Sequence, residues 1–121
     1  MIKPPITRHN FDLEGRTLEF AKKVIRLCKK LPNNAINREL IRQLIRASGS
    51  VGANYREAND ALSKKDFSNI IKITRREAKE SHYWLQLSEE ANSDFKDEIK
   101  ELLQEALELK KIFSTIADKS S

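Results

Sequence analysis

LIRQLIRASGSVGANYREA, residues 40–58, carries apolar or small side chains at steps of three and four. The residues that set this period are Leu40, Leu44, Ala47, Val51, Tyr55 and Ala58, and Leu62 continues the row. Such spacing gathers side chains on one face of a helix with 3.6 residues per turn. We therefore predict an amphipathic helix over roughly residues 36–61, capped at its start by Asn34 or Asn37.

The middle of this stretch, residues 47–53, contains small residues and one valine, and two of the small residues are Gly49 and Gly52. A glycine inside a helix costs about 1 kcal/mol relative to alanine. Close approach of a neighbouring helix is the usual compensation, and we predict it here. A break in the helix at this point is the alternative.

Three further helices are predicted on either side of the central one, over residues 12–31, 64–91 and 94–117. The first begins at a plausible N-cap, Asp12, and Pro32 ends it. Ser63 caps the third and Ser93 the fourth. Residues 1–11, with two consecutive prolines, are expected to be an irregular lead-in. The first helix has an apolar face of Leu18, Ala21, Val24, Ile25 and Cys28.

Length and composition agree with a single all-helical domain over residues 1–121. The chain holds only 3 Gly and 3 Pro, too few for the many turns of an all-β fold. Connections of a few residues force neighbouring helices to run antiparallel. The sequence thus predicts an all-α, antiparallel, up-down-up-down four-helix bundle.

Several kinds of chemistry are not supported by the residue pattern. A di-metal bundle needs Glu-x-x-His pairs, but Lys79 stands three residues before His82, and His9 falls in the lead-in. Cys28 is expected to be a small buried hydrophobe rather than a nucleophile. We therefore expect no catalytic residues, no metal and no cofactor. No apolar segment approaches the ~20 residues of a membrane span, and no secretory signal is evident, so a cytoplasmic location is expected.

Two carboxylates, Glu77 and Glu80, fall on the apolar face of the third helix and need partners. The central helix offers polar groups that could meet them. We predict a structural polar network that fixes helix register, formed by Asn54, Glu57, Glu77 and Glu80. A functional groove at the two glutamates is the alternative.

Positive charge is concentrated in the front of the chain. Residues 1–79 carry 18 Lys/Arg against 8 Asp/Glu, whereas residues 80–121 carry 5 against 10. This asymmetry suggests an anionic partner, head-to-tail contact between copies, or merely a solvated surface. The third helix carries a basic stripe, and the first two carry the residues predicted to contact nucleic-acid phosphates: Lys22, Arg26, Lys29, Arg38, Arg42, Arg46 and Arg56. Base stacking is not expected, because Tyr83 and Trp84 are expected to be packed.

Two runs, SGSVGANYREA (residues 48–58) and REAKESHYWL (residues 76–85), resemble the 23S rRNA intervening-sequence proteins. The resemblance extends from about Phe11 to Ile116. It implies an antiparallel four-helix bundle that assembles as a homopentamer with a basic central channel. A related branch of that family is the accessory protein of diversity-generating retroelements, which binds a reverse transcriptase and nucleic acid.

Residue pattern and resemblance together predict a non-enzymatic, homo-oligomeric bundle that binds structured RNA or another nucleic acid through phosphate contacts. An association with the ribosome or its RNA follows from the resemblance alone. The alternative is a protein adaptor or assembly factor, for example for a reverse transcriptase, with no direct contact to nucleic acid.

Overall fold

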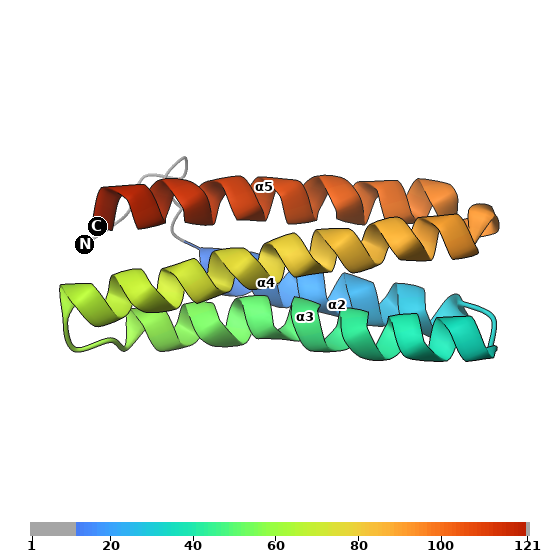
Figure 1. Cartoon of the computed structure of the whole chain (residues 1–121), viewed down its shortest axis with the longest axis horizontal. Helices are drawn as coiled ribbons and strands as arrows, with labels where there is room; N and C mark the ends of the chain where they lie inside the picture. Colours follow the sequence, from blue (N-terminus) through green and yellow to red (C-terminus); the bar gives the residue numbers. More distant parts are fainter. Residues whose placement is uncertain (1–11, 121) are drawn as a thin grey trace.

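A computed structural model describes residues 12–120, which form four long helices and no strand. The predicted lead-in at residues 1–11, which includes His9, lies outside the described residues. Successive helices run antiparallel along the long axis of the molecule, which confirms the up-down-up-down bundle (Figure 1). The helices are α2 (Leu13–Lys30), α3 (Ala35–Asn59), α4 (Lys64–Ala91) and α5 (Lys96–Ser120), and a short 3-10 turn, η1 (Ser93–Phe95), precedes α5.

Most helix starts agree with the predicted caps. Asp12, Asn34 and Ser63 each accept a hydrogen bond from the backbone N–H three residues later, at 2.8–3.1 Å. Ser93 was predicted to cap the last helix, but it instead begins η1, and α5 starts at Lys96. The last helix also runs three residues beyond the predicted end at 117, because no proline or glycine interrupts it there.

The core runs through all four helices. Phe20 of α2 and Phe113 of α5 are its largest fully buried side chains, and the Phe113 ring lies 5.5 Å from that of Tyr55 on α3. Helix α4 packs along both α3 and α5, whereas α2 packs mainly on α3 and less on α5. Leu62 does not extend the core row as predicted. It is 99% exposed, because α3 has already ended at Asn59.

Helix α3 is continuous through its small-residue segment, so the alternative of a break is wrong. A Cβ atom placed on Gly52 would lie 3.0 Å from the hydroxyl oxygen of Thr17 and 3.4 Å from its Cβ. Gly52 therefore marks the predicted close approach of a neighbouring helix, α2. Gly49 does not, since a Cβ there would meet nothing within 4 Å.

The two glycines should respond in opposite directions to alanine. Gly49→Ala should raise the free energy of unfolding by up to about 1 kcal/mol, because the new methyl group enters open space in a helix. Gly52→Ala should lower it, since Thr17 is buried and its hydroxyl is held at 2.7 Å by the Leu13 carbonyl. Urea denaturation at several protein concentrations measures both. Equal stabilisation by the two changes would contradict the close approach.

A buried pair of side-chain amides fixes one end of the bundle. Asn37, at the start of α3, and Asn92, just after α4, each donate to the side-chain oxygen of the other at 2.9 Å. Asn37 also donates to the Pro32 carbonyl at 2.9 Å, and Asn92 to the Ser88 carbonyl at 3.0 Å. Both side chains are almost fully buried. The pair thus ties the α2–α3 connection to the end of α4.

Removing one partner of this pair should cost more than its hydrogen bonds alone. Asn37→Ala leaves the buried Asn92 amide without its reciprocal partner, and we expect a loss of about 1–3 kcal/mol. The Asn37→Ala, Asn92→Ala double variant should lose less than the sum of the two single variants, because no orphaned amide remains. Chemical denaturation of the four proteins in the cycle gives the coupling. Strict additivity would show that the amides act independently.

Candidate nucleic-acid interface

The seam between the first and last helices is closed by ion pairs. The Arg16 guanidinium donates to both carboxylate oxygens of Glu105, at 2.7 and 2.8 Å, and to Glu108 at 2.9 Å. Hydrogen bonds to these carboxylates, above all that from Arg16 to Glu105, raise the pKa of the arginine further above its usual value. Lys30 donates to Glu98 at 2.9 Å further along the same seam. Part of the acidic charge of the C-terminal helix therefore neutralises basic residues of α2 within the same chain.

On the other side of α5, cations gather in a groove between α4 and α5. Its volume is about 540 Å³. It is lined by Lys72, Ile73, Arg75, Arg76 and Lys79 of α4 and by Lys110 and Ser114 of α5. Within residues 12–120, Arg76 is the one of these five cations with a carboxylate oxygen within 4.0 Å, that of Glu77. We call this surface the α4–α5 groove.

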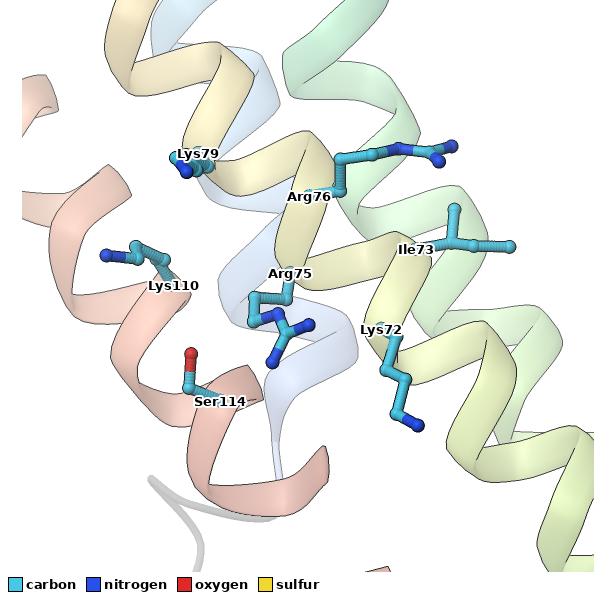
Figure 2. Close-up of a pocket in the computed structure, with 7 residues that line it drawn as sticks. All are labelled: Lys72, Ile73, Arg75, Arg76, Lys79, Lys110 and Ser114. Carbon is cyan, nitrogen blue, oxygen red and sulfur yellow. The ribbon is translucent and has the colours of Figure 1, made fainter. Parts of the chain in front are cut away.

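Figure 2 shows how the cations of the α4–α5 groove are distributed around α4. Arg75 extends toward α5, on the side where Ser114 lies, and Lys110 projects from α5 itself. Arg76 extends to the opposite flank of α4, over α3. An anion in this groove would therefore meet positive charge from two helices, and the charge continues over the outer surface of α4.

The arginines predicted on α3 form one exposed row, but each has a partner nearby. Arg38 donates to the Asn33 side chain at 3.1 Å. Arg42 donates to Glu39 at 2.7 Å, and hydrogen bonds from Gln43 and Arg42 lower the pKa of that carboxyl. The row consists of Arg38, Arg42 and Arg46, and we call it the α3 row.

Arg46 joins the α3 row to α4. It donates to Glu77 at 3.3 Å and to Glu80 at 2.7 Å. The side chain of Glu77 is only 9% exposed, and its second oxygen lies 4.0 Å from Arg76. Glu77 thus stands between an arginine of the α3 row and one of the α4–α5 groove, so the two basic surfaces meet at this carboxylate, and together we call them the basic band.

The predicted polar network is assembled differently from the expectation. Glu77 and Glu80 do come together, through Arg46. Asn54 instead donates to the Ser50 carbonyl of its own helix at 2.8 Å, and Glu57 is exposed. The Asn37–Asn92 amide pair is a buried polar contact between helices that was not predicted. Neither asparagine stands out in the sequence, because both fall at helix ends, where asparagine is common.

The remaining predicted contacts lie apart from the band. Lys22 and Lys29 are exposed on α2. Arg26 pairs with Glu19 at 3.1 Å, which lowers the pKa of that carboxyl, and it lines a groove shared with several carboxylates of α5. Arg56 lies 3.9 Å from Glu14 of α2. The seven predicted residues therefore do not form one surface.

The core holds the single cysteine of the chain. Cys28 is buried, as predicted, and burial raises the pKa of its thiol to about 11. Among residues 12–120, no three His, Cys, Asp or Glu side chains are grouped so that they could hold a metal ion. None of the described helices is long and apolar enough to cross a membrane.

Fold and surface together define a small antiparallel four-helix bundle with a basic band over α3, α4 and α5. The chain belongs to the 23S rRNA-intervening sequence protein family, whose sequence pattern it matches over residues 10–115. A similar solved structure is that of a protein of unknown function from the S23 ribosomal protein family of Bacteroides thetaiotaomicron VPI-5482. It is 29% identical, with a TM-score of 0.76, and the match covers 86% of this chain and 96% of that one. No curated protein matches the chain.

Proposed function

We propose that this protein binds structured RNA, or another nucleic acid, through its phosphates, and that its role is binding rather than catalysis. The observation that carries the proposal is the α4–α5 groove, whose lining includes five cations and no acidic residue. Lys and Arg arrays bind phosphate backbones by releasing condensed counterions. The family name refers to a sequence inserted in ribosomal RNA, which favours RNA among the polyanions.

The α3 row is proposed as a second, weaker part of the same interface. Each arginine of the row already has a carboxylate or amide partner, which it must give up to bind a phosphate. Binding therefore gains less free energy than it does at a cation that is paired only with water. The row nevertheless continues the band through Glu77, so a bound strand could pass from α4 to α3. The groove should therefore contribute more affinity than the row.

Three matched variants test this order. The groove variant (Lys72→Gln, Arg75→Gln, Lys79→Gln) should reduce affinity for a structured RNA at low salt at least tenfold. It should also flatten the plot of log K against log salt by about 0.7–0.9 for each phosphate that is no longer bound. The row variant (Arg38→Gln, Arg42→Gln, Arg46→Gln) should lose less affinity. Fluorescence anisotropy across a salt series measures both quantities.

A control variant loses the same charge outside both surfaces and separates a local contact from the effect of net charge. Its changes are Lys23→Gln, Lys96→Gln and Lys119→Gln. It should change affinity much less than the groove variant. Equal losses in all three variants would reduce the interface to diffuse attraction. Unchanged affinity and slope in the groove variant, with circular dichroism showing an intact fold, would remove the groove from the proposal.

We further propose that the protein is a homo-oligomer, with five subunits as the family resemblance implies. An exposed apolar face on α2 and α3 supports self-association. The sequence places Leu18 and Ile25 on the apolar face of α2, yet they are 42% and 46% exposed. Ile45 of α3 is 40% exposed. A shallow groove of about 310 Å³ runs between the two helices, and its lining includes Leu18, Ala21, Gly49, Gly52 and Ala53. Exposed apolar surface of this kind marks protein–protein contacts.

A charged residue on this face should dissociate the oligomer. Leu18→Glu together with Ile25→Glu should shift the mass toward that of the monomer, because burying two carboxylates at an interface is costly. Leu62→Glu is the control, since Leu62 is fully exposed after the end of α3. Analytical ultracentrifugation at several concentrations gives the masses. A wild-type chain that stays monomeric throughout would contradict assembly, and the face would then favour the adaptor function.

A further inference from the structure

Tyr83 stands out on the surface of α4. Its ring was expected to be packed, but 54% of the residue is exposed. It follows Lys79 by one helical turn, and Lys72, Arg76, Lys79 and Tyr83 succeed one another at steps of four, three and four. These residues therefore share the outer face of α4. An aromatic ring thus stands at the end of a row of cations that belongs to the α4–α5 groove.

The Tyr83 ring has a fixed neighbour. Its centroid lies 5.2 Å from that of Trp84, and the two rings meet edge to face, at 74°. Trp84 is half-buried and packs against the core, so it braces the tyrosine from the protein side. A braced, exposed ring loses little conformational freedom when another flat group stacks on it.

We propose that Tyr83 is a stacking site for an unpaired nucleobase, and that the flanking phosphates bind along Lys79, Arg76 and the rest of the α4–α5 groove. This inference rests on the proposed nucleic-acid function and specifies its substrate: single-stranded segments or loops rather than uninterrupted duplex. A single exposed ring beside a cationic row suits unpaired nucleotides, whose bases are free to stack. In a continuous duplex the bases are already stacked on one another, so no base is free to stack on the Tyr83 ring.

The test compares a 12-nucleotide oligouridylate with an RNA duplex of the same length. Tyr83→Ala should weaken binding of the single strand about tenfold and leave duplex binding unchanged. Tyr83→Leu should behave like Tyr83→Ala, since an aliphatic side chain offers no ring face. Tyr83→Phe should retain wild-type affinity, because stacking uses the ring and not the hydroxyl. A loss in Tyr83→Phe equal to that in Tyr83→Ala would overturn stacking in favour of a hydroxyl hydrogen bond.

The chain provides its own optical reporter for the same experiment. It contains one tryptophan, Trp84, in contact with Tyr83. Saturation with oligouridylate should change Trp84 emission in the wild type and much less in Tyr83→Ala. The groove variant distinguishes failure of stacking from failure of nucleic-acid binding. If it loses affinity for both RNAs while Tyr83→Ala loses none, nucleic-acid binding stands and stacking fails. If the groove variant keeps its affinity for both RNAs, the groove leaves the proposal, and if the wild type binds neither RNA at low salt, the proposed function itself fails.

Discussion

The contact of Arg16 with Glu105 and Glu108 holds an acidic side of the last helix against the first helix. It joins the first helix to the last, which pack against each other less than the other neighbouring helices of the bundle do. Because the carboxylates on that side of α5 face α2, they are directed away from α4. On the α4 side of α5, Lys110 instead lines a groove with cations of α4. Part of the uneven charge along the chain is thus paired within the chain on the α2 side of α5, whereas the lining of the α4–α5 groove holds cations and no acidic residue.

The helices could be predicted from the sequence because their determinants are local. Asp12, Asn34 and Ser63 cap the helices through backbone groups three residues away, and Pro32 acts on its immediate neighbour. The Asn37–Asn92 pair could not be predicted, since its partners are 55 residues apart and depend on how α3 and α4 are aligned. The start of α5 was misplaced for a related reason: a 3-10 turn comes between Asn92 and the helix.

The candidate interface was harder to predict than the fold, because a basic stripe on one helix says nothing about what faces it. The regular spacing of the α3 row predicted phosphate contacts, yet Glu39, Glu77 and Glu80 lie beside its arginines. The stripe on α4 is equally visible in the sequence. Its importance comes from Lys110, more than 30 residues further along the chain, and from the absence of acids in the lining of the groove. Exposure of Tyr83 likewise depends on how α4 is rotated within the bundle.

The single thiol, Cys28, can serve as a chemical probe of opening of the first helix. Cys28 is buried on the inner face of α2, so a thiol reagent should reach it mainly when that helix opens. α2 is the shortest of the four helices, and it packs mainly on α3 and only lightly on α5. Opening of α2 should therefore cost less free energy than unfolding of the whole bundle. The rate at which Cys28 becomes alkylated in native protein should therefore report how often α2 opens.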